Sequence, residues 1–282
     1  MSPNGVSILI LTKNEEKDLP GCLESISWSD DIHVFDSFST DRTVEIAKTH
    51  GATVTQRPSM ARQAFFGGNE AEHKNWGLRN IPFRHNWILQ LDADERVPCE
   101  LAQEIQRTSL DSSYFVAYRI RRRDFFLGTW LKHTSASPFN LRLFRPEKMR
   151  YERLVNPISI PDGPVGELRS YFDHFPFNKG MSHWFDRHNT YSSLEARQIM
   201  TNRRNQIEFS LYWALFATDI NERRFHQKEA FYRLPARPLI KFFLLYFLKR
   251  GFLDGRAGFT YAILQSIYEY MIVLKTRELE LS

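Results

Sequence analysis

The stretch Trp87-Ile-Leu-Gln-Leu-Asp92-Ala93-Asp94-Glu95 combines an apolar run of strand length with three acidic residues at its end. Short apolar runs are typical of strands covered on both faces of a parallel sheet. Such a strand delivers Asp92 and Asp94 to the carboxyl edge of the sheet, where ligands bind. Their oxygens suit Mg²⁺ or Mn²⁺, but an isolated Asp-x-Asp more often caps a helix, here one starting near Pro98. The surrounding sequence is needed to choose between a metal site and a helix cap.

The residues before this stretch alternate between strand and helix patterns. Apolar runs of strand length lie at Val6–Leu11, Ile32–Phe35 and Ala52–Thr55, and helical spacing lies at Asn14–Trp28 and Thr43–His50. Alternating strands and helices predict a parallel sheet with right-handed crossovers. The predicted fold class is therefore α/β, with a Rossmann-like, mostly parallel sheet flanked by helices.

The pattern changes after residue 110. Tyr114–Ile120 and Phe139–Phe144 read as longer antiparallel strands, and in the second of them Arg142 lies on the polar face. From about Lys179 the chain reads as mostly helical, and breaks are expected at Pro235, Pro238 and Gly251. We therefore divide the chain into residues 1–178, which hold the predicted sheet, and a helical region, residues 179–282.

Composition limits the classes of protein. Cys22 and Cys99 are the only cysteines, which argues against a disulfide framework or a zinc cluster and fits a reducing cytosol. The apolar N-terminal run has no basic region before it and no cleavage site after it, so we expect a buried strand and not a signal peptide. Thr201–Arg256 carries eleven Lys and Arg against five Asp and Glu. Nucleic acid, anionic lipid or a phosphorylated substrate would each suit such a region.

Polar residues also follow the first two predicted strands. The first strand runs into Thr12-Lys13-Asn14-Glu15, and the second runs into Asp36-Ser37-Phe38-Ser39. The carboxyl ends of parallel strands meet at one edge of a sheet. We therefore expect these residues to share one site with the Asp-x-Asp pair.

Taken together, these segments resemble the opening of family 2 glycosyltransferases. Ser7–Glu15, Val34–Thr43, the helix start Lys74-Asn75-Trp-Gly-Leu and the Asp-x-Asp strand follow one another in the family's order and spacing. The resemblance implies the GT-A fold and transfer of a sugar from a uridine- or guanosine-type diphosphate donor, with a UDP-sugar favoured. It also implies Mg²⁺ or Mn²⁺, which neutralises charge on the departing diphosphate.

The resemblance assigns roles to individual residues. Asp36 matches the aspartate that holds the nucleobase, Asp92 is directed mainly toward the ribose, and Asp94 is directed mainly toward the metal. The implied metal ligands are Asp92 and Asp94, and the implied catalytic residues are Asp94 and Arg142. The implied nucleotide-contacting residues are Thr12, Asn14, Glu15, Asp36, Ser37, Lys74, Asp92 and Ala93.

Simpler interpretations of three of these residues stay open. Asp36 also suits a turn, and Lys74 also suits a solvated helix surface. Arg142 suits either contact with a phosphate or donor sugar, for which its planar guanidinium is well shaped, or surface solvation.

Further segments resemble the bacterial subgroup that builds lipopolysaccharide cores and related surface polysaccharides. They are Trp28-Ser-Asp-Asp-Ile, Leu91-Asp-Ala-Asp-Glu-Arg-Val and Arg250-Gly-Phe-Leu-Asp-Gly-Arg-Ala-Gly-Phe. This resemblance implies a surface polysaccharide, a lipopolysaccharide or a lipid-linked glycan as the acceptor.

The chain departs from that subgroup at one informative place. Relatives often carry Val-His-Glu after the Arg-Leu-Phe-Arg strand, with the Glu in position to act as general base, but here the stretch reads Leu154-Val155-Asn156-Pro157. Neither Asn nor Pro accepts a proton, although an inverting transfer to a hydroxyl needs a base. Either another carboxylate substitutes, or an already ionised acceptor such as a polyprenyl phosphate needs no base. The candidate substitutes are Glu152, Asp162, Glu167 and Asp186.

Two later segments carry open alternatives of their own. His174 suits either a late metal ligand, as in other GT-A enzymes, or a structural role. The predicted helix His183–Ser192 either lines an acceptor site, since sugars stack on aromatic faces, or simply packs Trp184.

The C-terminal apolar segments predict contact with a membrane surface. Leu239–Leu248 is too short to span a bilayer, which takes about 20 residues. Ala257–Leu274 has spanning length but contains Gln265 and Glu269. We interpret both as interfacial or packed helices whose basic neighbours meet anionic headgroups. The expected location is peripheral, at the inner face of the cytoplasmic membrane.

Two other classes of protein are less well supported. A nucleotidyltransferase of sugar phosphates would carry a Gly-rich phosphate loop after the first strand, where this chain has Thr12-Lys13-Asn14-Glu15. A non-catalytic nucleic-acid-binding protein would suit the basic region, but no nucleic-acid motif accompanies the charge, and carboxylates at the sheet edge would repel phosphate without a metal. We therefore predict an inverting glycosyltransferase with no nucleic-acid partner.

Overall fold

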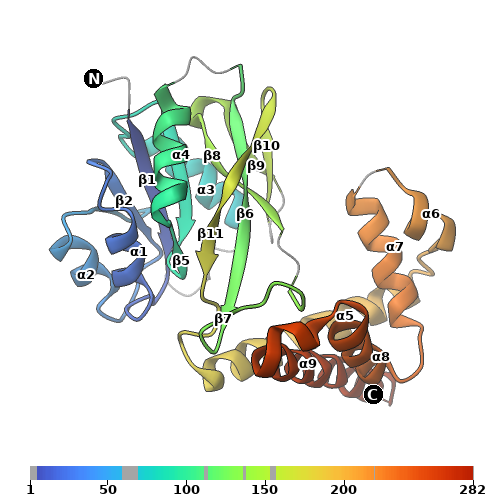
Figure 1. Ribbon diagram of the computed structural model, residues 1–282. Coiled ribbons are helices and arrows are strands. Elements are labelled where there is room, and N and C mark those ends of the chain that lie inside the picture. Colours follow the sequence, from blue (N-terminus) through green and yellow to red (C-terminus); the bar gives the residue numbers. More distant parts are fainter. Residues whose placement is uncertain are drawn as a thin grey trace. The chain divides into compact units, whose positions relative to one another are not determined.

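The computed structural model describes residues 5–58, 69–110, 114–135, 138–152, 157–218 and 220–281 (Figure 1). The chain forms two compact units. The sheet unit comprises Met1–Phe125 and Ser137–Asn178, and the helical unit comprises Phe126–Ala136 and Lys179–Ser282. Each unit is described in turn.

The sheet unit is built on one large mixed sheet. Its strands follow the order β3-β2-β1-β4-β8-β6-β11-β5. The pairs β3–β2, β2–β1, β1–β4 and β6–β11 are parallel, whereas β8 runs antiparallel to β4 and β6. The bounds are β1 Val6–Thr12, β2 Ile32–Asp36, β3 Thr53–Thr55, β4 Trp87–Asp92, β5 Glu95–Arg96, β6 Ala117–Phe126, β8 Phe139–Phe144 and β11 Val165–His174.

Helices cover both faces of this sheet. On β1, Ile8 and Ile10 pack in one hydrophobic cluster with the side chains of α1 and α4, while Leu9 and Leu11 pack in a second cluster that includes α3. Alternate residues of a strand point to opposite faces, so β1 is buried throughout. The bounds are α1 Leu19–Ser25, α2 Thr43–Thr49, α3 Glu70–Asn80 and α4 Cys99–Leu110, with a short 3₁₀ turn at Pro146–Lys148 and a two-stranded ribbon of β9 Met149–Glu152 and β10 Ile158–Pro161.

Three element boundaries differ from the sequence expectation. The first helix begins at Leu19, since Asn14 has a left-handed backbone (φ 56°) that no helix accepts. The strand expected from Tyr114 begins at Ala117, and Tyr114 is exposed. Lys74 lies inside α3, because that helix already begins at Glu70, where the Asn69 side chain caps the backbone N–H of Glu72.

The helical unit contains five helices among its described residues. The long helix α9 packs against α5 and α8, and Ile199, Tyr232 and Ile272 form a small hydrophobic core. Pro238 lies in the first turn of α8, so it begins a helix where we expected a break. The bounds are α5 Met181–Arg204, α6 Leu211–Phe216, α7 Ile220–Tyr232, α8 Arg237–Phe243, a π turn Leu244–Leu248, a 3₁₀ turn Gly251–Asp254 and α9 Gly255–Leu281, with β7 at Thr129–Trp130.

The Arg250–Phe259 motif has a structural role in this unit. The buried Asp254 carboxylate accepts hydrogen bonds from the backbone N–H groups of His133 and Thr134 and from the Thr134 hydroxyl. Gly258 lies so close to the carbonyl of Gly251 that a Cβ would stand 2.1 Å from that oxygen. The motif therefore fastens the segment at 133–134 to the start of α9.

The fold class predicted from the sequence is confirmed. The sheet is mixed but mostly parallel, helices flank it, and a long helix ends the chain. Within the described part of the chain, no helix combines the length and apolar character needed to cross a membrane.

Candidate active site

Three neighbouring strands bring the predicted site residues to one edge of the sheet. In the strand register, Thr12 of β1 pairs with Asp36 of β2, and Leu11 of β1 pairs with Asp92 of β4. All three strands are parallel, so their carboxyl ends align. The loops that follow them therefore form one continuous polar edge.

Asp36 organises the loop that follows β2. Its buried carboxylate accepts hydrogen bonds from the Thr12 hydroxyl (3.0 Å), the Gln56 amide (2.7 Å) and both the hydroxyl and backbone N–H of Ser39 (2.5 and 2.9 Å). The neighbouring Ser37 hydroxyl lies 3.3 Å from His73 Nε2. These bonds fix the loop after β2 in one shape.

The loops after β1 and β2 are also tied to each other. Lys13 Nζ donates to the carbonyl groups of Ser37 and Phe38, and Asn14 Oδ1 accepts from the backbone N–H of Thr40. The backbone N–H of Glu15 donates to the Thr43 hydroxyl at 2.7 Å. Asn14 itself is exposed. The loops after β1 and β2 therefore form one unit that internal hydrogen bonds hold in shape. This double loop contains Thr12, Asn14, Glu15, Asp36 and Ser37.

Arg142 neutralises two carboxylates at the end of β4. Its Nη2 atom lies 2.6 Å from Asp92 Oδ2 and 2.5 Å from Glu95 Oε1. Glu95 is fully buried, and burial raises its pKa to about 7. Desolvation is the largest effect and raises the pKa of Asp92, but the charge of Arg142, its hydrogen bond and the charge of Lys74 together outweigh it, so the pKa is lowered. Arg142 Nε is buried without a hydrogen-bond partner.

Asp94 belongs to a second cluster, centred on His174. His174 Nε2 lies 3.3 Å from Asp94 Oδ2, and His174 Nδ1 lies 2.7 Å from Asp124 Oδ1. The strand β11 pairs with β5 and β6, which brings His174 between these two acids. Desolvation lowers the pKa of His174, but the bonds to Asp124 and Asp94 outweigh it and raise the pKa to about 9.

Lys74 and its neighbour Asn75 connect α3 to β9. Lys74 Nζ forms an ion pair with Glu70 (3.2 Å) and lies 5.2 Å from the centre of the Tyr151 ring. Asn75 exchanges two 2.8 Å hydrogen bonds with the backbone of Tyr151, whose hydroxyl donates to Gln90 at 2.5 Å. Sequence reasoning missed Tyr151 and Gln90, because only the fold brings them beside this motif.

All four candidate bases are exposed side chains. Glu152 and Asp162 form surface ion pairs with Arg150 and Lys148, and Glu167 is exposed. Asp186 is an exposed residue of the helical unit. The stretch Leu154–Asn156 lies outside the described residues. Ala93 is buried between the two acidic residues of the Asp-x-Asp pair.

The helix at residues 183–192 shows a packing role for its tryptophan. Trp184 is buried, and its ring stacks on that of His188 with 3.7 Å between the centroids. The stacked pair leaves no free tryptophan face on that side for a sugar. Of the two interpretations of this segment, the geometry favours packing.

Asp94 and His174 are the residues that fit a divalent ion best. Their facing oxygen and nitrogen atoms are both of types that bind such ions, although His174 must first release the proton that it shares with these acids. Asp124 orients the imidazole as carboxylates orient metal-bound histidines. Among the described residues no three acidic, histidine or cysteine side chains form a complete cage. A site of two protein ligands is nevertheless usual where substrate phosphates complete the coordination.

Comparison with known sequences establishes the class of protein. Residues 7–175, more than half of the chain, match the model of glycosyl transferase family 2. The chain belongs to this family and is a glycosyltransferase.

Its relatives include several bacterial proteins of similar length. It is 27% identical to the lipopolysaccharide core biosynthesis glycosyltransferase LpsC of Rhizobium meliloti, over 96% of this chain and 91% of that protein. It is 25% identical to an uncharacterised glycosyltransferase of Rickettsia typhi, over 98% of this chain and 88% of that protein.

Solved structures with a similar arrangement include S. aureus TarS. It has 14% identity and a TM-score of 0.42, with 94% of this chain and 91% of that chain covered. Another is M. tuberculosis glucosyl-3-phosphoglycerate synthase in complex with Mn²⁺, UDP-glucose and phosphoglyceric acid. It has 22% identity and a TM-score of 0.35, with 43% and 44% covered.

Proposed function

We propose that this glycosyltransferase moves a sugar from a nucleotide-diphosphate sugar, with a UDP-sugar favoured, to a lipopolysaccharide, surface polysaccharide or lipid-linked acceptor. The observation that carries the proposal is the alignment of the Asp36 loop, Asp92 and Asp94 at one sheet edge. Family membership and the name of the R. meliloti relative support the choice of acceptor class.

The sheet unit is proposed to hold the donor. Thr12, Asn14, Glu15, Asp36 and Ser37 would receive the nucleoside, because their loop is prearranged by internal hydrogen bonds and needs little ordering on binding. Asp92 and Ala93 would contact the ribose end. Lys74 would meet the diphosphate, since it lies on α3 and its charge acts on Asp92.

Asp94 and His174 are proposed to hold Mg²⁺ or Mn²⁺, with Asp92 beside them. When bound, the ion would neutralise the negative charge that grows on the departing diphosphate. This chain's own contribution is to fix the donor. His174 is oriented by Asp124, and Asp92 is held by Arg142, which leaves the donor phosphates little freedom of placement.

The transfer is proposed to invert the anomeric carbon. An acceptor oxygen attacks that carbon from the face opposite the diphosphate, the new C–O bond forms, and the bond to the diphosphate oxygen breaks. A hydroxyl acceptor must lose its proton, whereas an ionised phosphate acceptor has none to lose. The second possibility is supported by Asn156 and Pro157, which cannot accept a proton where relatives often carry His and Glu.

Residues 179–282 are proposed to contact the acceptor and the inner face of the cytoplasmic membrane. Apolar side chains of α6 and of the segment from Leu239 onward are exposed in unusual number. The helix α6 carries Leu211, Tyr212, Leu215 and Phe216, each more than 60% exposed, and sequence reasoning missed it. Its signal was a six-residue apolar run directly after the cap residue Ser210.

The test is a donor panel. Nucleotide sugars are incubated with the protein, with Mn²⁺ or with chelator, and release of the nucleoside diphosphate is measured. Release from one donor class that requires the metal supports the proposal. Pyrophosphate release from a nucleoside triphosphate and a sugar phosphate would instead indicate a nucleotidyltransferase. Absence of both hydrolysis and thermal stabilisation with every donor would overturn the proposal.

A further inference from the structure

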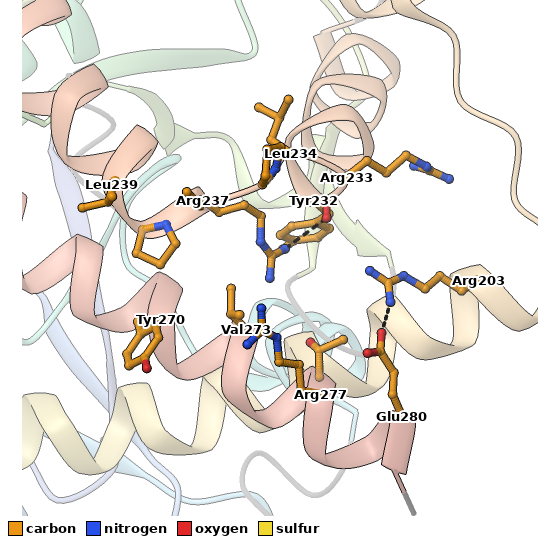
Figure 2. A pocket seen from close by; sticks show the side chains of 14 residues that line it. Arg203, Tyr232, Arg233, Leu234, Arg237, Leu239, Tyr270, Val273, Arg277 and Glu280 are labelled. Carbon is orange, nitrogen blue, oxygen red and sulfur yellow. Dashed lines mark hydrogen bonds and ion pairs between the residues drawn. The ribbon is translucent and has the colours of Figure 1, made fainter.

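The helical unit contains a pocket lined by four arginines. It has a volume of about 580 Å³, within the usual range for small-molecule sites, and every lining residue belongs to the helical unit (Figure 2). Arg203 comes from α5, Arg233 from the turn after α7, Arg237 from α8 and Arg277 from α9. Arginines from four chain segments therefore line one cavity.

Arg237 is a buried cation whose polar contacts are long. It is 6% exposed, its Nε lies 3.4 Å from Glu269 Oε1, and its Nη1 donates to the Tyr232 carbonyl at 3.5 Å. Both distances are at the outer limit for hydrogen bonds, and Glu269 Oε1 has no hydrogen-bond partner. A guanidinium offers five N–H donors, so Arg237 can donate to further acceptors beside these two contacts.

The other arginines differ in how far they are neutralised. Arg203 forms an ion pair with Glu280, which also lines the pocket, and Arg233 pairs with Glu229 at 3.0 Å. Arg277 has no hydrogen bond or ion pair with any other residue in the described part of the chain. Figure 2 shows the side chains of Arg237 and Arg277 turned toward the middle of the pocket.

The electrostatics of the pocket favour an anion. Four arginines face three glutamates, Glu229, Glu269 and Glu280, so positive charge is in excess. Burial lowers the pKa of Arg237, Glu269 and then Tyr232 raise it, and the repulsion from Arg203 is a smaller lowering effect. A bound anion would offset the excess positive charge and accept further hydrogen bonds from the guanidinium groups.

Apolar side chains line the same pocket as the arginines. Leu239 and Tyr270 are 62% and 52% exposed, and Leu234 is also exposed, as are Arg203, Arg233 and Arg277. A pocket with exposed cationic and apolar side chains suits a ligand whose anionic group is attached to an apolar body. This mixed lining therefore favours a lipid headgroup over a free ion.

We propose that this pocket binds a phosphate or diphosphate group, carried by a lipid or free in solution. Planar guanidinium groups hold phosphate oxygens through paired, charge-assisted hydrogen bonds. Arg237 and Arg277 supply the contacts, with Arg203 adding charge. The site consists only of helical-unit residues, so it shares no residue with the proposed donor site.

Arg277→Gln is the test variant, since it leaves the buried Arg237–Glu269 pair in place. Arg256→Gln is the matched control, because Arg256 is exposed on the same helix and does not line the pocket. Binding of inorganic pyrophosphate is measured by calorimetry in chelator, which removes metal-assisted binding at the donor site. Sedimentation with phosphatidylcholine vesicles containing phosphatidic acid is compared with phosphatidylglycerol vesicles of matched surface charge.

Arg277→Gln should weaken pyrophosphate binding, or reduce the preference for phosphatidic acid over phosphatidylglycerol, by about tenfold or more, whereas Arg256→Gln should change either quantity by less than about twofold. Pyrophosphate binding by the native protein identifies a free-anion site. A preference for phosphatidic acid without pyrophosphate binding identifies a headgroup site. Either result supports the proposal if it depends on Arg277. The proposal is overturned if the native protein binds neither pyrophosphate nor phosphatidic acid vesicles in preference, or if the two variants weaken binding equally. Donor hydrolysis should be unchanged in both variants, so this outcome is independent of the transferase proposal.

Discussion

Arg142 Nη2 lies 2.6 Å from Asp92 Oδ2, and the same nitrogen lies 2.5 Å from Glu95 Oε1. One guanidinium therefore serves both an acid of the Asp-x-Asp pair and the fully buried acid that follows it. The backbone N–H of Asp92 donates in turn to Glu95 Oε2 at 2.9 Å. Arg142 and Glu95 thus set the position of Asp92 before any donor is bound.

We predict that Arg142→Ala destabilises the protein by about 3 kcal/mol, because it leaves Glu95 buried without its cation. The matched control is Arg150→Ala, which breaks the ion pair with Glu152 at the surface. Its cost should be below about 0.5 kcal/mol, because solvent screens exposed pairs. Urea unfolding measures both values, and equal costs would show that the buried pair contributes no more than a surface pair.

The sequence predicted the strand of Arg142 but not its partners. Phe139–Phe144 was expected as a strand with Arg142 on the polar face, and the structure has a strand with those bounds. The contact with Asp92 depends on antiparallel pairing of β8 with β4, across about fifty residues. Periodicity describes a strand locally and carries no information on its neighbour, so this contact could not be predicted.

The same limit applies to His174 and to α3. The Asp-x-Asp motif could be found from its residues, but His174 joins Asp94 only because β11 lies between β5 and β6. The Lys74-Asn75 motif was recognised, yet the paired hydrogen bonds between Asn75 and Tyr151 are again a product of tertiary packing. The local sequence pattern identified the strands and helices and the sheet edge that carries the site. The hydrogen bonds and ion pairs within that edge depend on the fold and could not be predicted.

We predict that Asp94→Asn lowers donor turnover about 100-fold or more while the melting temperature of the free protein changes little. A carboxylate placed against a divalent ion matters more to the transition state than to folding. A second readout is independent of turnover. Mn²⁺ with UDP at 100 times its dissociation constant should stabilise the native protein by about 2.7 kcal/mol, and the variant should lose the part that depends on Mn²⁺.

Glu152→Gln is the control for this Mn²⁺ effect, since Glu152 lies in a surface ion pair on β9. It should keep the metal-dependent stabilisation. Native-like turnover in Asp94→Asn, or undiminished activity of the native enzyme in chelator, would contradict the metal assignment.

We predict that Asp36→Ala raises the Michaelis constant for the donor at least about tenfold and changes the saturated rate much less. Contacts to the nucleoside are alike in the ground and transition states, so their loss appears mainly in binding. The variant should also lose about 1–3 kcal/mol of stability, because Thr12, Ser39 and Gln56 lose their acceptor. A collapse of the saturated rate with unchanged donor affinity would show that Asp36 is not a nucleoside residue.

We predict that Asp254 makes the stability of the protein depend on pH in the acid range. Burial raises its pKa, but hydrogen bonds from Thr134 and His133 outweigh burial, and the folded-state pKa lies below the ordinary value. A group of this kind contributes stability above its unfolded pKa of about 3.9, and the contribution disappears as pH falls through the folded pKa. Asp254→Asn should therefore cost about 1–3 kcal/mol at pH 6 and progressively less below pH 4.

The control for Asp254 is Asp162→Asn, which alters a surface ion pair with Lys148. Chemical unfolding at several pH values should show little change for it throughout. A cost of Asp254→Asn that is the same at pH 6 and pH 3 would mean that the carboxylate charge plays no part.

We predict that the exposed segment after Leu239 attaches the protein reversibly to anionic membranes. Phe247 is 52% exposed and stands beside Lys249 and Arg250, whereas Leu245 is 4% exposed. Each basic residue near an anionic surface contributes about 1 kcal/mol, which salt screens, while apolar contact resists salt. High salt should therefore release only part of the bound protein, and Lys249→Glu with Arg250→Glu should shift protein to the supernatant in a liposome sedimentation assay.

The exposed and buried side chains of this segment separate membrane contact from packing. Phe247→Ser should reduce liposome binding and leave the melting temperature nearly unchanged, because its side chain meets solvent. Leu245→Ser should cost about 2–5 kcal/mol, as truncation of a buried leucine does, through lost internal packing. Donor hydrolysis should persist in Phe247→Ser and in the double charge variant. Native protein that stays in the supernatant with phosphatidylglycerol liposomes at low salt would end the membrane proposal, because both the charge and the apolar contact should be at their strongest there.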